Sequence, residues 1–313
     1  MKRFLLVLSF LAAIIAGVGV ARIQYELDST LNKMDRESAV NLSEAVEGEE
    51  NLTSDDKIIN ILLIGADKRE SWSESGRSDT VMIATLDMKH KQLKLTSLMR
   101  DMWVEIPGYG NHKFNAAYSY GGVSLLYRTI AVNFGLKLDG YAVVDFKAFQ
   151  EVIDAMDGVE IELTREEYEY LVEAYKRHPE VKNGLQPGKN IMNGAQALAY
   201  SRVRQVGRSD FRRTERQRTV IQSMFTKVKS MSMGEIKRLA EKMLPNIVTD
   251  LSNEQIYSYM FSVLTMGTTE IKQFRIPTDE AHTPETIGKE KVLTLDLPAN
   301  VEALNKFIFE AAE

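Results

Sequence analysis

The chain has 313 residues, 44% of them hydrophobic and 27% charged, with a formal net charge of −5. This composition is typical of one large or two small globular domains. The absence of cysteine excludes disulfide bonds, a thiol nucleophile and zinc sites built on thiolates. The four histidines are scattered without metal-ligand spacing, so histidine chemistry is not expected.

An apolar run near the N-terminus predicts a membrane anchor. Two basic residues precede residues 4–21, in which Ser9 is the one clearly polar side chain. As a helix this run is about 27 Å long, close to the ~30 Å hydrocarbon core and longer than the ~7–15 apolar residues of a signal peptide. Gly19 and Ala21 leave a cleaved signal peptide as the alternative. By the positive-inside rule, residues 1–3 are cytoplasmic and the chain beyond the run lies outside the cytoplasm.

The amino-acid composition and hydrophobic pattern change near residue 57. Residues 22–56 are polar and acidic, so we predict an extracytoplasmic stalk or linker. Beyond it, β-branched runs predict strands and helical periodicity predicts helices. The expected strands cover 57–65, 80–87, 92–99, 141–146, 158–163, 271–277 and 292–300. The expected helices cover 113–134, 146–156, a long segment from Asp210 into the 240s that Pro245 ends or kinks, and the end of the chain from about Val301.

This alternation of strands and helices predicts an α/β fold. We expect a layered α/β/α sandwich with a central mixed β-sheet, preceded by a single N-terminal transmembrane helix. Residues 57–313 form one extracytoplasmic domain in this interpretation.

Two carboxylates lie at the ends of the first two predicted strands. Asp67 closes NILLIGAD and Asp79 opens the next strand in GRSDTVMI. If these strands are antiparallel neighbours, the carboxylates share one sheet edge, where a cation between them would relieve their repulsion; hard oxygen ligands suit Mg²⁺. Roles as turn or cap residues account for both equally well.

Arginine is concentrated late in the chain. Residues 201–218 contain seven arginines and no lysine. Arg202 and Arg204 alternate, so an extended segment would point them the same way, while Arg213 and Gln217 follow Asp210 at helical spacing. Arginine binds phosphate through a planar fork, so this pattern indicates a phosphate-rich ligand. A solvated helix face with pairs such as Arg212 and Glu215 accounts for some of the seven.

Arg100 and Asp101 follow the third predicted strand, where a surface ion pair is the ordinary interpretation. Nucleic acid is not an expected partner, because the chain is acidic and its folded part is predicted to be exported. The arginine run also lacks the aromatic interleaving of a typical binding patch, since Phe211 is its single aromatic residue. Neither a GxxxxGK[ST] phosphate loop nor a GxSxG elbow is present.

Six ordered motifs between residues 58 and 225 resemble the LytR-CpsA-Psr family of bacterial envelope proteins. They are GADKRESWSESGRSDTVM, SLMRDMWVEIPG, HKFNAAYSYGG, YAVVDFKAF, GLQPGKNIMNGAQALAYSRVR and SDFRRTERQR. The resemblance implies a membrane-bound, Mg²⁺-dependent phosphotransferase on the cell surface. Such an enzyme moves an anionic glycopolymer, such as wall teichoic acid or capsule, from a polyprenyl-pyrophosphate carrier to peptidoglycan and releases polyprenyl phosphate. It also implies an apolar groove for the polyprenyl tail.

The resemblance implies roles for the residues of this chain that match the family's motifs. Asp67 and Asp79 would coordinate Mg²⁺, with Arg77 beside them at the pyrophosphate. The pyrophosphate oxygens would be bound by Arg100, Arg202, Arg204 and Arg213. Asp210 and Gln217 would order these arginines, with Asp210 as the better proton acceptor.

Two other functions remain open at this stage. A membrane-bound transcriptional attenuator would need the arginine surface in the cytoplasm, against the predicted topology. A non-catalytic polyprenyl-phosphate binder would have less need of the carboxylate pair. Pyrophosphatase activity is an expected side reaction of the same site.

Overall fold

The computed structural model describes residues 28–36, 39–48, 51–66, 78–207 and 210–312. Its strands are β1 (Ile58–Ala66), β2 (Ser78–Asp87), β3 (Gln92–Leu98), β4 (Trp103–Ile106), β5 (Gly110–Lys113), β6 (Gly140–Asp145), β7 (Val159–Leu163), β8 (Gly188–Met192), β9 (Ile247–Thr249), β10 (Ile271–Ile276), β11 (His282–Ile287) and β12 (Glu290–Leu295). Its α-helices are α2 (Leu42–Ala45), α3 (Ala116–Phe134), α4 (Phe146–Ala155), α5 (Arg165–Ala174), α6 (Pro179–Lys182), α7 (Gly194–Ser201), α8 (Asp210–Ser230), α9 (Met233–Met243), α10 (Asn253–Met266) and α11 (Leu297–Phe309).

A six-stranded sheet in the order β10-β3-β2-β1-β6-β9 forms the centre of the molecule. The first three strands form an antiparallel meander, while β6 joins β1 and β10 joins β3 in parallel. The sheet is therefore mixed, which confirms the predicted α/β fold class. Strands β1 to β3 are rich in β-branched and aliphatic residues because both of their faces are covered.

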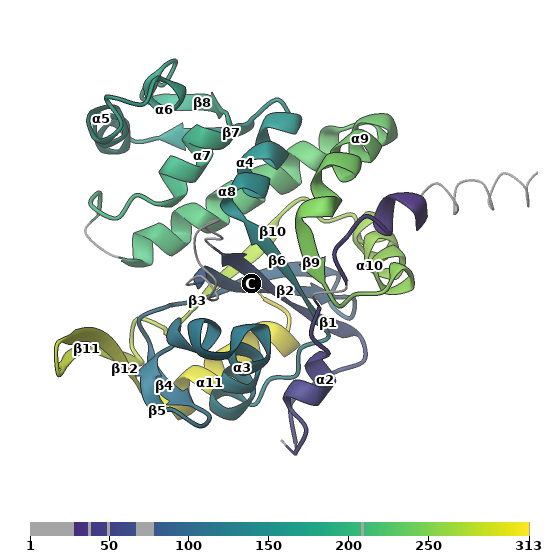
Figure 1. Ribbon diagram of the computed structural model, residues 1–313, viewed down its shortest axis with the longest axis vertical. Helices are drawn as coiled ribbons and strands as arrows, with labels where there is room; N and C mark the ends of the chain where they lie inside the picture. Colours follow the sequence, from purple (N-terminus) through teal and green to yellow (C-terminus); the bar gives the residue numbers. More distant parts are fainter. Residues whose placement is uncertain (1–27, 37–38, 49–50, 67–77, 208–209, 313) are drawn as a thin grey trace, which may run out of the picture.

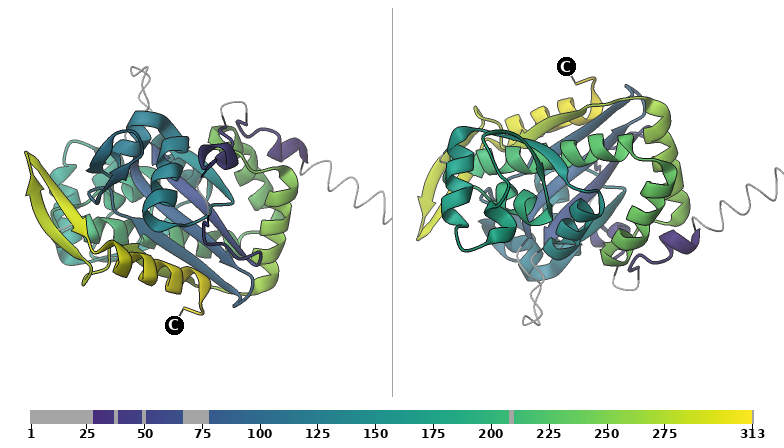
Figure 2. Two further views of the ribbon diagram at one scale, coloured as in Figure 1. Left: turned by 90° about the horizontal axis from the view of Figure 1, so that it is seen from below. Right: turned by 90° about the horizontal axis from the view of Figure 1, so that it is seen from above.

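Helices cover both faces of this sheet. Figure 1 shows α3 and α11 below the sheet and α4, α8 and α9 above it, and Figure 2 shows the same layers from two other sides. On the α3 side, Ile83, Tyr127 and Leu304 belong to one buried cluster. Above the sheet, Val152 and Val220 belong to a second cluster that includes the small β7–β8 sheet.

Several of the expected elements differ from the structure, among them the following. The long helix from Asp210 into the 240s is two helices, because Ser232 and Glu235 form a capping box that starts α9. The last helix begins at Leu297, where Asp296 caps it, and not at Val301. The strand expected at 158–163 is β7, which pairs with β8 outside the central sheet.

The segment predicted as a stalk, residues 22–56, packs on the domain where it is described. Leu31, Met34 and Leu42 are buried, and Asp35 forms a bridge to β9. The described ranges contain no helix with the length and apolarity of a membrane span, and the anchor predicted at 4–21 lies outside those ranges.

Gly194, the first residue of α7, packs against the backbone of α4. A Cβ atom at this position would lie 2.3 Å from the carbonyl oxygen of Gln150 and 2.6 Å from its Cα. We expect Gly194→Ala to lower the free energy of unfolding by about 1–3 kcal/mol, because neither backbone can yield without cost. Gly234→Ala is the control, since the nearest atom to its Cβ would lie 4.0 Å away. Urea denaturation checks both, and equal effects would contradict this packing argument.

Candidate functional site

Three arginines surround the carboxylate of Asp210. Its Oδ1 lies 3.4 Å from Arg213 Nη2, 3.6 Å from Arg204 Nε and 3.9 Å from Arg100 Nη2. This oxygen is buried and accepts no hydrogen bond within the described part of the chain. We call these four residues the arginine cluster. These contacts are longer than a direct hydrogen bond between a guanidinium group and a carboxylate.

A second carboxylate adjoins the arginine cluster. Asp101 lies 3.3 Å from Arg100 Nε and accepts a hydrogen bond of 2.9 Å from Lys113 Nζ. Burial raises the pKa of Asp101, but the Lys113 hydrogen bond and the Arg100 charge outweigh it, so this pKa lies below its ordinary value. Because Arg100 contacts both Asp101 and Asp210, it joins this second carboxylate to the arginine cluster.

Three separate elements carry the arginine cluster. Arg100 follows β3, Arg204 follows α7, and Asp210 and Arg213 lie in the first turn of α8. The predicted helical spacing from Asp210 to Arg213 is confirmed. Because the N-terminus of a helix attracts negative charge, α8 adds to the positive potential at this point.

Arg202 lies apart from the arginine cluster. The extended segment predicted around it is wrong: α7 runs to Ser201, and Arg202 is its C-cap. The guanidinium carbon of Arg202 lies 4.1 Å from the centre of the Phe146 ring, a cation–π contact. Arg202 and Arg204 therefore turn to different partners. Phe146 lines the cavity described next, which puts Arg202 at its border.

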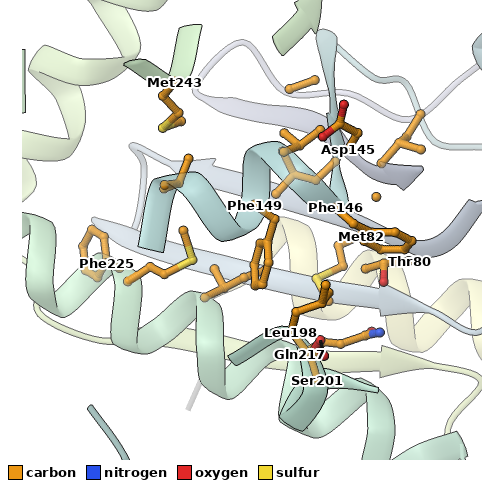
Figure 3. Close-up of a pocket in the computed structure, with 18 of the residues that line it drawn as sticks. Thr80, Met82, Asp145, Phe146, Phe149, Leu198, Ser201, Gln217, Phe225 and Met243 are labelled. Carbon is orange, nitrogen blue, oxygen red and sulfur yellow. Dashed lines mark hydrogen bonds between the residues drawn. The ribbon is translucent and has the colours of Figure 1, made fainter. Parts of the chain in front are cut away.

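An apolar cavity of about 430 Å³ lies between the sheet and helices α4, α7, α8 and α9. Gln217, predicted to order the arginines, lines it at the same end as Thr80 and Ser201 (Figure 3). Phe225 and Met243 lie at the opposite end. The cavity is elongated, with polar side chains at one end and apolar side chains at the other.

Arg100 also lines two polar cavities. The larger, about 620 Å³, lies between the arginine cluster and the β11–β12 hairpin. The smaller, about 230 Å³, is lined by Ser119, Tyr120 and Lys113. The rings of Tyr109 and Tyr120 stack at 4.7 Å and are 52% and 43% exposed. Lys113 and Tyr120 lie in the HKFNAAYSYGG motif, and the sequence predicted no role for either of them.

The expected metal ligands fall largely outside what the structure describes. Asp67 and Arg77 lie outside the described residues, and only the backbone of Asp79 is described. Ala66, the residue before Asp67, pairs with Ser78, the residue before Asp79, beside a register shift. The backbone therefore brings the ends of β1 and β2 together as expected. Within the described residues, no group of three His, Cys, Asp or Glu side chains could hold a metal.

Other arginines of the 201–218 segment support the fold. Arg216 pairs with Glu167 on α5 at 2.7 Å, and Arg218 donates to Ser97 Oγ at 2.9 Å. Burial and the nearby Arg275 charge lower the pKa of Arg218 to about 10. Arg212 makes the predicted exposed pair with Glu215. The sequence does not distinguish Arg216 and Arg218 from the arginine cluster, because their partners come from distant elements.

The fold and these cavities define an α/β protein with an open apolar cavity one turn of α8 away from a cationic cluster. Residues 21–305 match the model of the LytR_cpsA_psr family, so the chain belongs to this family. It is 32% identical over 275 residues to the polyisoprenyl-teichoic acid–peptidoglycan teichoic acid transferase TagV of Bacillus subtilis, which covers 82% of this chain and 67% of TagV. It is 29% identical over 256 residues to the regulatory protein MsrR of Staphylococcus aureus, covering 80% of this chain and 75% of MsrR.

Solved structures agree in fold. TagT bound to LI-WTA superposes with a TM-score of 0.67 at 24% identity, covering 83% of this chain and 95% of that one. TagT with bound octaprenyl pyrophosphate lipid gives 0.64 at 22% identity, with the same coverage. At these identities the likeness supports the fold alone.

Proposed function

We propose that this protein transfers an anionic glycopolymer, such as wall teichoic acid or a capsular polysaccharide, from a polyprenyl-pyrophosphate carrier to peptidoglycan. The product is a phosphodiester, and polyprenyl phosphate leaves. The observation that carries the proposal is a sequence of three environments: an apolar cavity, a cationic cluster at its polar end, and polar cavities beyond. A molecule with a long apolar tail, a pyrophosphate and a sugar has the same three parts.

The apolar cavity suits the polyprenyl tail. Its lining is hydrophobic apart from a few polar residues at the end near Gln217 (Figure 3). A phosphate at that end would lie next to α8, whose first turn carries Asp210 and Arg213. TagT, of the same fold, has a solved structure with octaprenyl pyrophosphate lipid bound.

The arginine cluster would neutralise the pyrophosphate. In the transition state of phosphoryl transfer, negative charge spreads over the phosphate oxygens. Preorganised cations stabilise this charge more than water does. Arg100, Arg204 and Arg213 would bind these oxygens, and Arg202 would contribute from the border of the apolar cavity. Asp210 touches all three cluster arginines, which fits an ordering role.

Mg²⁺ is the proposed cofactor. Asp67 and Asp79 would hold it, with Arg77 nearby, because carboxylate oxygens suit this ion and the backbone joins the ends of β1 and β2. The ion would supply further neutralisation of pyrophosphate charge.

The acceptor would enter from the polar cavities. A sugar hydroxyl of peptidoglycan attacks the phosphorus that carries the glycopolymer, and the bond from that phosphorus to the bridging oxygen breaks. The hydroxyl proton passes to Asp210, whose buried Oδ1 accepts no hydrogen bond within the described residues. Water in place of the sugar would give pyrophosphatase activity.

The proposed location is the cell membrane, with residues 1–3 in the cytoplasm, the run at 4–21 across the bilayer and the catalytic domain outside. Peptidoglycan and the lipid-linked glycopolymer are the proposed partners, and nucleic acid is not one.

The test is a transfer assay. The full chain in lipid nanodiscs is mixed with a polyprenyl-pyrophosphate-linked glycan and peptidoglycan oligomers, with and without Mg²⁺, and the products are analysed by mass spectrometry. A phosphodiester adduct that requires Mg²⁺ supports the proposal. If the protein binds the lipid but forms no adduct with any of several donor glycans, a non-catalytic binder or a regulator would be favoured. A regulator is the second candidate function, because the relative MsrR is named a regulatory protein.

Filling the apolar cavity should weaken binding of long lipids. Met224 lines it from α8, whereas Thr226 on the same helix is exposed and does not line it. We expect Met224→Trp to weaken binding of a long-chain polyprenyl pyrophosphate at least about tenfold, or about 1.4 kcal/mol. A two-isoprene analogue should be affected less than about threefold, because it needs only the end near Gln217.

Isothermal titration with both lipids measures this difference, and Thr226→Trp is the matched control. Equal loss for short and long lipids, or equal loss in the control, would argue against a tail in this cavity.

A further inference from the structure

Helix α10 exposes an apolar face. Phe261 and Leu264 are 69% and 68% exposed, and Met260 is 41% exposed. They lie on one side of the helix at i, i+1 and i+4. Met88, 36% exposed, contacts the same helix at Ser262, whose Oγ lies 3.5 Å from the Met88 Sδ. We call these four residues the α10 patch.

The composition of α10 is unusual for the surface of a soluble domain. Residues 255–266 contain no charged side chain. No residue of the helix is fully buried, and Met260, Phe261 and Leu264 belong to none of the buried clusters. Contiguous exposed apolar side chains mark a surface that meets a partner or a membrane.

The start of the described chain is fixed to the same helix. Tyr257 Oη donates to Asp28 Oδ1 at 2.7 Å, and Asn253 Nδ2 donates to the same oxygen at 3.0 Å. Leu31 and Met34 pack in one cluster with Ile256 and Tyr257. Figure 1 shows the first described residues beside α10.

The predicted anchor therefore ends close to α10. Seven residues of chain lead from Ala21, the last of the apolar run, to Asp28, so at most about 25 Å separates them even when fully extended. A domain tied to a bilayer by so short a connection keeps the attached helix near the lipid surface.

The far end of the apolar cavity lies on the α10 side. From Gln217 to Val228, both of which line the cavity, α8 advances roughly 16 Å. Beyond Gln217, α8 is bonded to the segment that follows α10: Gln222 Oε1 accepts from Ile271 N at 2.8 Å, and Lys229 Nζ donates to Thr268 O.

We propose that the α10 patch lies in the interface of the membrane's outer leaflet and turns the far end of the cavity toward the bilayer. The inference rests on the proposed function for the anchor and the lipid donor. Burying one Phe, Leu or Met side chain contributes about 1.5–3 kcal/mol, enough to hold an already tethered domain in one orientation. A second copy of the chain fits less well, because four side chains cover far less than the ~800 Å² per partner of a stable interface.

A depth measurement tests this inference without any need for activity. The natural chain has no cysteine, so Leu264→Cys gives one labelling site. The full chain is labelled with an environment-sensitive fluorophore and placed in nanodiscs of phosphatidylglycerol and phosphatidylethanolamine with and without brominated acyl chains. Ile191→Cys, 64% exposed on β8, is the control.

We expect brominated lipid to quench the label at position 264 at least twofold and to leave the label at 191 unchanged. Equal, weak quenching at both positions would overturn the inference. The inference would also be overturned if the label at position 264 were buried with or without lipid and the protein formed a dimer in detergent. The α10 patch would then contact a second copy of the chain.

A double variant links the orientation to lipid delivery. Phe261→Asp with Leu264→Asp should remove quenching of a label at Met260→Cys. It should lower transfer from a bilayer-embedded donor at least fivefold and leave transfer from a detergent-solubilised donor unchanged. Equal transfer from both donors would overturn the proposed delivery. If neither the parent nor the double variant transfers glycan but the label in the parent is quenched, the proposed function is wrong. The inference that the α10 patch contacts the membrane is then still supported.

Discussion

Arg213→Ala is expected to lower the rate of glycopolymer transfer at least about 100-fold, the loss typical for one preorganised group that stabilises transition-state charge. Arg213 is 3% exposed and lies 3.4 Å from Asp210 within the arginine cluster. Arg213→Lys should also fall well below the parent, because an ammonium cannot contact two phosphate oxygens through a planar fork. Mass spectrometry of the transfer product under single-turnover conditions gives the rates.

Arg212 is the matched control, since it neighbours Arg213 on the same helix but is exposed and pairs with Glu215. Arg212→Ala should leave transfer within about twofold of the parent, as expected for the loss of an exposed ion pair. Thermal unfolding shows whether each variant is folded. A folded Arg213→Ala protein with parental activity would remove the arginine cluster from the mechanism.

Lys94→Met is expected to destabilise the fold by about 3–5 kcal/mol, because it leaves a buried carboxylate without its cation. Both side chains of the Lys94 and Asp87 pair are fully buried, and the nitrogen lies 2.6 Å from the oxygen. Lys94 also donates to the carbonyl groups of Ile308 and Glu310, so it joins β3 to the end of α11. Urea denaturation at pH 7 measures the loss.

The pH dependence of this effect has a defined sign. Burial raises the pKa of Asp87, but the hydrogen bonds from Lys94 and His90 lower it by more than burial raises it. The folded-state pKa therefore lies below 3.8. A lowered pKa stabilises the fold above the unfolded-state value, and this contribution is lost as the pH falls through the folded-state value. The gap between parent and Lys94→Met should therefore narrow below about pH 4.

Lys89→Met is the control for this pair, because Lys89 makes a half-exposed contact of 3.2 Å with Asp55. An exposed pair contributes roughly 0–1 kcal/mol. If both lysine variants lost the same stability at pH 7, the buried pair would have no special role.

The sequence predicted the centre of the sheet because each strand there carries a local signal. Strands β1, β2 and β3 are apolar runs separated by polar turns. The break between α8 and α9 also had a local signal, since Ser232 and Glu235 have capping-box spacing, but the periodicity on either side concealed it. The pairing of β7 with β8 depends on chain distant in sequence, which no local pattern reports.

The candidate site was only partly predictable. Arg213 and Asp210 follow from helical spacing, and the alternation of Arg202 with Arg204 led to a wrong extended segment because the cap that starts α7 lies upstream at Asn193. The apolar cavity could not be predicted from the residues alone. Phe149 and Met224 have the spacing of ordinary core residues, and only the tertiary structure leaves space between them.

A consequence for donor selection follows from the course of α8. One uninterrupted helix carries Arg213 in the arginine cluster and Val228 at the far end of the apolar cavity. In the proposed function, the distance between the reacting phosphate and the end of the cavity would therefore be constant unless the helix bends. Isoprene units beyond that distance would lie outside the cavity and would add nothing to recognition. The protein would distinguish donors by their first few isoprene units and treat all longer carriers alike.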